Sequence, residues 1–401
     1  MRMSVKQLVF IFLIGGIFLG GVFDCQAEGV RGVTDSEIRI GAMYDQTGPA
    51  SPVGVPIAKA FKNYFRWVNE RGGINGRKIK LIIEDDRYTV PGAIAAYKKL
   101  LLKDEILAIL GPASSHSIFA LTSSILKDKI PCVVPPSSDR VVIPPKRYMF
   151  ASGPTYGDQI QLIYQYIVRD LRKKNPRIAF VYNDIEHGKL GLKAAKKYKE
   201  KYGIDIVSIE IVNPGTLDAT SQVLSIRRKK PDFIILHLLV DNSIVTMKSA
   251  RKMGMNVPFL GTQYTCTEDT VKVSGKAASN YKGMAIYSSW YDKGPAMDDL
   301  RKVTLKYYPG TEKPYRPKAY TQGWGDATIL SEGLKRAGRD INGETFVKAL
   351  ESIKDFDMKG LSGPVTFGPD NRKGSRYIRM YKANVKEGLL TPISDWITLA
   401  D

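Results

Sequence analysis

A short polar stretch, ILGPASSHS, places Ser114, Ser115, His116 and Ser117 directly after an apolar run and a Gly-Pro turn. Hydroxyls beside a histidine could form a catalytic pair, hold a phosphate or bind another anion. A nucleophile elbow has the pattern G-x-S-x-G, and this stretch lacks the second glycine. Neighbours along a helix do not face each other, so Ser115 and His116 make a poor local dyad. We therefore expect a protein that is not an enzyme.

Patterns typical of nucleotide and metal sites are also missing from the sequence. No G-x-x-x-x-G-K-[ST] or G-x-G-x-x-G follows a predicted strand, and the three histidines of the chain are scattered singly. Asp85 and Asp86 end a predicted strand and could hold a cation, although a solvated strand end or a helix cap explains them as well. We expect no cofactor and no metal.

The hydroxyls suit the binding of an anionic group such as a carboxylate. Ser114 or Ser115 would cap the helix that begins here, whose free N–H groups and positive dipole end would face the ligand. A second hydroxyl cluster, PPSSD with Ser137 and Ser138, follows the next predicted strand. Helix capping without any ligand remains the alternative, because it explains one serine well and the whole set less easily.

The elements that must position these side chains alternate between strand and helix. Apolar runs of strand length and segments of helical periodicity follow one another from Glu37 onward, and the pattern restarts at RIAFVYN (177–183). Such alternation is typical of parallel sheets covered by helices on both faces, so two similar α/β lobes with a cleft between them are the simplest architecture. Ligands of open α/β sheets bind at the carboxyl ends of the strands. Those ends fall in loops 45–54, 111–117, 135–139, 183–188, 239–242 and 262–267.

The N-terminus has the pattern of a secretory signal peptide. Basic Arg2 and Lys6 precede an apolar run (8–23), and small residues lead to a cleavage site after Ala27. The run is shorter than the roughly 18 residues or more of a membrane span. We expect residues 1–27 to be removed on export and the mature protein to be periplasmic.

Basic residues are in excess, and the chain carries a formal net charge of +20. Basic balance can indicate nucleic acid binding, but export argues against that partner. The densest basic runs (169–177 and 225–232) fall at predicted helix ends, where cations complement the helix dipole. Cys132 and Cys266 remain after cleavage, and the sequence leaves open whether a disulfide joins them.

Several segments have a specific order along the chain. The block GGINGRKI…EDD is followed by GPxSS, and PCVVPPSS and AYTQGWGDATILSEGLKRAG come later. Together they resemble the leucine/isoleucine/valine-binding family of type I periplasmic binding proteins, the solute receptors of ABC importers, over essentially all of the mature chain. The resemblance implies two Rossmann-like open parallel-sheet lobes joined by a three-crossover hinge. It places lobe 1 at 36–155 plus 288–360, and lobe 2 at 156–287 plus 361–401.

The resemblance also implies a function. A monomeric receptor would bind a branched-chain amino acid or a related small carboxylate between the lobes. Closure about the hinge would then present the solute to an ABC permease in the cytoplasmic membrane. A sensory role, in which the closed form is read by a signalling receptor, is an alternative.

The family's carboxylate clamp carries over to this sequence. Ser115 matches the serine that contacts the ligand carboxylate, with Ser114 beside it. Pro136 and Ser138 match positions that hold the same end of the ligand through backbone and hydroxyl, and Ser137 lies between them.

The opposite side of the cleft departs from the family pattern. His187 replaces a tyrosine, Leu239 or its neighbour replaces an aromatic residue, and Gln263 stands where an acidic residue usually binds the ammonium. Tyr264 could supply part of an apolar wall. A neutral amide lacks the charge that makes a bond to ammonium strong. An aromatic or aliphatic acid without an α-amino group is therefore an alternative ligand, and His116 keeps no assigned role.

Overall fold

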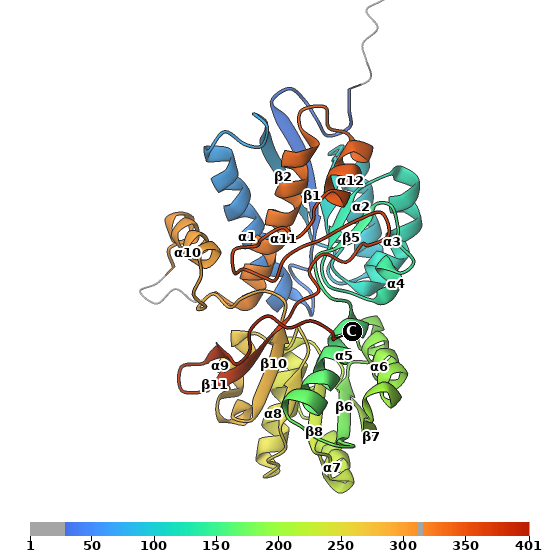
Figure 1. Cartoon of the computed structure of the whole chain (residues 1–401), viewed down its shortest axis with the longest axis vertical. Coiled ribbons are helices and arrows are strands. Elements are labelled where there is room, and N and C mark those ends of the chain that lie inside the picture. The colour runs from blue at the N-terminus through green and yellow to red at the C-terminus, as the bar shows by residue number, and fades with distance from the viewer. Residues whose placement is uncertain (1–28, 311–315, 401) are drawn as a thin grey trace, which may run out of the picture.

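The computed structural model describes residues 29–310 and 316–400, so the predicted signal peptide (1–27) lies outside the described residues. The chain forms two α/β lobes, one above the other in Figure 1. One sheet has five strands in the order β2-β1-β3-β4-β5, and the other has seven in the order β12-β11-β10-β9-β8-β6-β7. The expected architecture of two open, mainly parallel sheets is present.

The first lobe is built on an all-parallel sheet. Its strands are β1 (Glu37–Met43), β2 (Lys78–Glu84), β3 (Ala108–Leu110), β4 (Cys132–Val134) and β5 (Met149–Ala151). Its helices are α1 (Ser51–Glu70), α2 (Val90–Leu102), α3 (Ser115–Asp128), α4 (Asp139–Val142), α10 (Pro295–Tyr307), α11 (Lys318–Ala337) and α12 (Gly343–Glu351). Helices α1 and α11 pack against each other, so a helix from the second half of the chain completes this lobe.

The second lobe has a mixed sheet. Its strands are β6 (Arg177–Tyr182), β7 (Asp205–Ile211), β8 (Phe233–His237), β9 (Phe259–Gly261), β10 (Tyr281–Ala285), β11 (Arg379–Asn384) and β12 (Leu389–Pro392). Its helices are α5 (Tyr156–Gln165), continued by a π-helical turn (Tyr166–Asp170), α6 (Glu186–Tyr198), α7 (Thr220–Lys229), α8 (Val240–Lys252) and α9 (Glu268–Ser274), with 3₁₀ turns at Glu200–Tyr202 and Gly275–Ala278. Strand β11 runs antiparallel to β10 and to β12, and the other pairs are parallel.

The apolar runs of the sequence become the buried centres of both sheets. Every residue of β3, β4 and β8 is buried, as expected for parallel strands covered by helices on both faces. The side chains of Cys132 and Cys266 are both buried and free. Across residues 29–310 and 316–400, none of the helices is both long and apolar enough to cross a bilayer.

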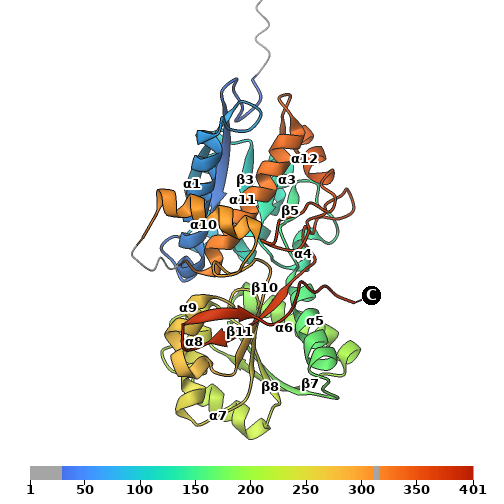
Figure 2. The same cartoon turned by 60° about the vertical axis from the view of Figure 1, so that its left-hand side comes forward.

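The chain crosses between the lobes three times, after β5, after β10 and before β11 (Figure 2). We keep the first two boundaries, near residues 155 and 288, as predictions. The third comes later than residue 361, because Lys373 pairs with Ala151 at the edge of the first sheet and Phe367 contacts Phe150 with a ring-centroid distance of 5.2 Å. We therefore propose that the chain re-enters the second lobe between Ser375 and β11.

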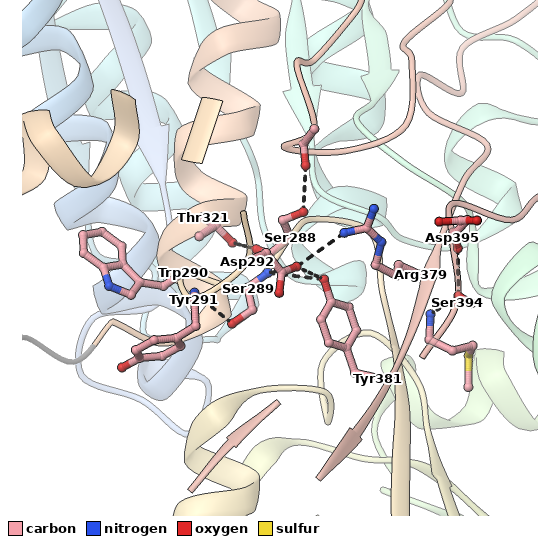
Figure 3. A network of polar contacts seen from close by, with 12 residues as sticks. Ser288, Ser289, Trp290, Tyr291, Asp292, Thr321, Arg379, Tyr381, Ser394 and Asp395 are labelled. Atoms are coloured by element: carbon pink, nitrogen blue, oxygen red, sulfur yellow. Dashed lines mark hydrogen bonds and ion pairs between the residues drawn. The ribbon is translucent and has the colours of Figure 1, made fainter. Parts of the chain in front are cut away.

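A network of polar contacts ties the second crossing to both lobes (Figure 3). On the side of the first lobe, Thr321 of α11 donates to the Ser288 carbonyl (2.6 Å). On the side of the second lobe, the Tyr381 hydroxyl of β11 donates to Asp292, and Arg379 lies 3.6 Å from the same carboxylate. Burial raises the pKa of Asp292, while Tyr381 and Arg379 partly offset that effect. These contacts fix the position of the connecting segment against each lobe.

Candidate functional site

A cavity lies between the lobes at the carboxyl ends of the strands. The free space between its lining atoms is about 50 Å³, below the roughly 300–1,000 Å³ typical of small-molecule sites, so a ligand of that size needs the two walls to move apart. The first lobe and its helix α11 contribute Tyr44, Asp45, Pro49, Ala50, Pro52, Val53, Gly54, Ile57, Tyr88, Ala113, Ser114, Ser115, Pro135 and Gln322. The second lobe contributes Tyr156, His187, Leu239, Val240 and Tyr264. Most of this wall is apolar or aromatic.

The two predicted serines stand at the start of α3, on the cavity wall. The Ser114 hydroxyl is the N-cap, accepting from the Ser117 N–H (3.2 Å) and donating to the Ser117 hydroxyl (2.6 Å). Ser115 is the first residue of the helix, and its hydroxyl lies 3.2 Å from that of Ser137 and 3.3 Å from that of Tyr156. Ser114 therefore caps the helix, whereas the Ser115 hydroxyl belongs to a buried cluster of hydroxyls at the cavity wall.

Five helices begin at this cavity. Lining residues occupy the start of α1 (Pro52), α3 (Ser115), α5 (Tyr156), α6 (His187) and α8 (Val240). Helices α1, α6 and α8 have no side-chain N-cap, so no capping side chain accepts a hydrogen bond from their first backbone N–H groups. Helix N-termini carry partial positive charge, which Asp158, Glu186 and Asp241 partly offset in the first turns of α5, α6 and α8. Helices α1 and α3 have no acidic residue in their first turns, so their termini favour an anionic group most.

His187 forms the centre of the second lobe's wall. Its ring stacks on that of His237 with a centroid distance of 4.1 Å. The rings of Tyr156 and Tyr264 stand edge to face with it, at centroid distances of 5.1 and 5.7 Å. His187 is 3% exposed, and neither ring nitrogen has a hydrogen-bond partner in the described part of the chain. Burial, and secondarily His237, lower the pKa of His187 well below its usual value, so the imidazole is neutral.

His237 is held by the protein. Its Nε2 lies 3.1 Å from the His187 carbonyl oxygen, which only accepts, so Nε2 carries the proton. Its Nδ1 lies 3.0 Å from the hydroxyl of Thr262. Burial lowers the pKa of His237 to about 4, so this ring is a neutral support for His187.

Four of the predicted site residues do not line the cavity. The Pro136 carbonyl accepts from the Tyr264 hydroxyl across the lobes (2.8 Å), and Ser137 lies behind Ser115. Ser138 is the N-cap of the short helix α4. The remaining predicted residues, Ser114, Ser115, His187, Leu239 and Tyr264, do meet at the cavity.

Gln263 is the fourth of these residues, and both ends of its amide are used within the protein. Its Nε2 donates to Gln322 (3.1 Å), and its Oε1 accepts from the Ile286 N–H (2.9 Å). The second of these bonds reaches the second crossing, so Gln263 links the cavity wall to the hinge. Sequence position placed it in a strand-end loop but could not show the direction of its side chain.

Several lining residues were missed, among them Tyr44, Tyr88, Tyr156 and Gln322. Tyr44 directly follows β1 and Tyr156 opens α5, so a search of strand ends and helix starts for aromatic residues could have found both. Gln322 gave no such signal, because it lies within α11, far along the chain from the first sheet, and reaches the cavity only through the packing of α11 on α1.

Three carboxylates, Asp45, Asp85 and Asp86, gather beside the cavity within 4.8 Å of one another. Asp45 accepts backbone N–H groups of Thr47, Gly48 and Ala50, so it fixes the loop before α1. Burial raises the pKa of Asp86 to about 6, helped by the charges of Asp45 and Asp85. The cluster thus has a structural explanation without a cation.

Asp326 lies fully buried on α11, one helical turn from Gln322. The Tyr287 hydroxyl donates to it (2.7 Å), which connects α11 to the second crossing. Burial raises the pKa of Asp326 to about 7, and polar side chains around it, Tyr287 first among them, partly offset the effect.

Residues 37–388 match the family described as periplasmic binding protein, which covers both lobes and every cavity residue. The chain belongs to this family. Its members are solute-binding proteins of ABC transporters and not enzymes, so the expectations of family and of a non-enzymatic protein are confirmed.

Named relatives agree with this assignment. The chain is 21% identical over 351 residues to the Leu/Ile/Val-binding protein BraC3 of Rhizobium johnstonii, covering 86% of this chain and 92% of that protein. A branched-chain amino acid ABC transporter structure from Thermus thermophilus with bound valine is similar at a TM-score of 0.84 and 22% identity, covering 92% of this chain and 98% of that one. The fatty acid ABC transporter substrate-binding protein from Thermomonospora curvata is similar at a TM-score of 0.81 and 25% identity. The match covers 93% of this chain and 96% of that one. The type I periplasmic binding protein fold is confirmed.

Proposed function

We propose that this periplasmic binding protein is the exported solute receptor of an ABC importer and binds a small carboxylate with an apolar body. The observation that carries the proposal is the cavity itself. It is enclosed by both lobes, lined mainly by apolar and aromatic groups, and entered by the N-termini of five helices, with the Ser115 hydroxyl among them. Such a site supplies hydrogen-bond donors for a carboxylate and desolvated surface for a hydrocarbon chain.

Contacts between the lobes support closure around the solute. Besides the bond from Tyr264 to Pro136, the Tyr156 hydroxyl of the second lobe lies 3.3 Å from that of Ser115 in the first. A ligand that bridges the two walls would favour this closed arrangement over an open one. The partner we propose for the closed, monomeric protein is an ABC permease in the cytoplasmic membrane.

Ligand extraction tests the proposal. The mature protein, purified from the periplasm of expressing cells, is denatured and the released small molecules are identified by mass spectrometry. We expect an intact small carboxylic acid, which should raise the melting temperature when added back to ligand-free protein. Recovery of a chemically altered form of an added ligand, or stabilisation only by neutral or cationic solutes, would contradict the proposal.

A further inference from the structure

We propose that the ligand is an apolar carboxylic acid without an ammonium group, and that His187 hydrogen-bonds a second, uncharged oxygen on it. The inference rests on the proposed function and names its substrate class. A 2-oxo or 2-hydroxy acid has this chemistry: a carboxylate for the helix N-termini and Ser115, and a neighbouring neutral oxygen.

The acidic group that an ammonium would need is not free at the cavity wall. Among the described lining residues, Asp45 is the single carboxylate. Its Oδ1 accepts from the N–H groups of Thr47 (3.2 Å) and Gly48 (2.5 Å), and its Oδ2 accepts from that of Ala50 (2.7 Å). A buried ammonium without a charged partner is costly, because its desolvation is not compensated.

The helix termini also favour a ligand oxygen over an ammonium group. The N-termini of α1, α3, α5, α6 and α8 all meet the cavity, and each presents the positive end of its dipole. Three of them belong to the second lobe, where Asp158, Glu186 and Asp241 in the first turns of α5, α6 and α8 partly offset the dipoles. The backbone N–H groups at these termini can donate to a ligand oxygen, but they cannot accept from an ammonium.

His187 supplies the second contact. It lines the cavity, it is nearly fully buried, and both ring nitrogens lack partners within the described residues. Buried polar groups are normally hydrogen-bonded, so these nitrogens point to a group brought by the ligand. A neutral imidazole offers one N–H donor, which an oxo or hydroxyl oxygen accepts. Stacking on His237 fixes the ring for this contact.

Two matched sets of acids test the inference by calorimetric titration of ligand-free mature protein. One set is 4-methyl-2-oxopentanoate, 4-methylpentanoate and leucine; the other is phenylpyruvate, 3-phenylpropanoate and phenylalanine. Within the set that fits the cavity, we expect the 2-oxo acid to bind at least about tenfold more tightly than the other two. Equal or tighter binding of the amino acid overturns the inference and leaves the proposed function standing. Binding of none of the six overturns both.

Variants of His187 test its role separately. His187→Leu removes both hydrogen-bonding nitrogens, and His187→Gln keeps a donor and an acceptor. We expect the Leu variant to lose the preference for the 2-oxo acid over the plain acid and the Gln variant to keep most of it. Binding of the plain acid, which has no second oxygen, reports whether each variant is folded. Lys189→Gln, on the exposed side of α6, serves as the matched control and should change neither affinity. An unchanged preference in His187→Leu assigns the second contact elsewhere and overturns this role.

Discussion

At the scale of single residues, the account depends on Ser115. Its hydroxyl is buried between those of Ser137 and Tyr156 and stands at the first residue of α3. Ser115→Ala removes a hydrogen bond to a charged carboxylate, so we expect binding to weaken by about 1.5–3 kcal/mol. Calorimetry with the tightest-binding acid measures this loss. Ser123→Ala, at an exposed position of the same helix, is the control, and an equal effect of both variants would refute the role of Ser115.

Asp326 gives a residue-scale prediction on pH. Its pKa is about 7 in the folded protein and about 4 in an unfolded chain. Below pH 4 both states hold the proton, and between pH 4 and 7 only the folded state does. Stability therefore falls as pH rises through this window, by up to about 4 kcal/mol. Asp326→Asn removes this penalty and keeps an acceptor for Tyr287.

Urea unfolding at pH 5, 6, 7 and 8 measures the effect. The free energy of unfolding of Asp326→Asn minus that of the wild type should grow as pH rises to 7 and then level off. His237, whose pKa is lowered to about 4, changes stability in the opposite direction, but it is present in both proteins and cancels in the difference. A difference that stays constant with pH would show that Asp326 is ionised throughout.

Residue types and strand-end positions were enough to predict part of the site. Ser115 follows a strand and opens a helix, so its position in the chain predicted a place at the cavity, whereas His187 was expected there from the family resemblance. Gln263 satisfies the same criterion, yet its amide bonds Gln322 and the Ile286 N–H. The direction of a loop side chain depends on partners from other segments of the chain. The pattern at the end of one strand carries no information about those partners.

At the scale of elements, N-caps set the helix starts that face the cavity. The Ser114 side chain caps α3, and that of Asn342 caps α12 away from the cavity. We expect Ser114→Ala and Asn342→Ala each to lower the free energy of unfolding by about 1 kcal/mol. Chemical denaturation measures both. No loss in Ser114→Ala would mean that α3 does not depend on its cap.

The order of elements was predictable, and one pairing was not. Alternating apolar runs gave the parallel strands of both sheets, because each run is long enough for a buried strand and is followed by a helical segment. The segments GPVTFG (363–368) and YIRMYKANV (377–385) suggest a closing β pair, but Val365 makes only isolated bridges, to Phe356 and Ser375. It packs on the first lobe, and the last two strands pair with each other instead.

At the scale of the whole molecule, closure brings the two walls together. The Tyr264 hydroxyl donates to the Pro136 carbonyl across the cavity. Tyr264→Phe keeps the ring against His187 and removes this bond, so the closed form should lose about 0.5–1.5 kcal/mol of stability. We expect affinity to fall by that amount, and small-angle scattering should still show ligand-dependent compaction. An unchanged affinity would mean that the bond contributes nothing to closure.

The central claim is that a carboxylate lies between the start of α3 and His187. A crystal structure of the protein with the acid that binds most tightly tests it directly. We predict a carboxylate oxygen within hydrogen-bonding distance of the Ser115 hydroxyl and a neutral ligand oxygen at a ring nitrogen of His187. A ligand with its carboxylate turned away from α3, or bound outside this cavity, would contradict the account.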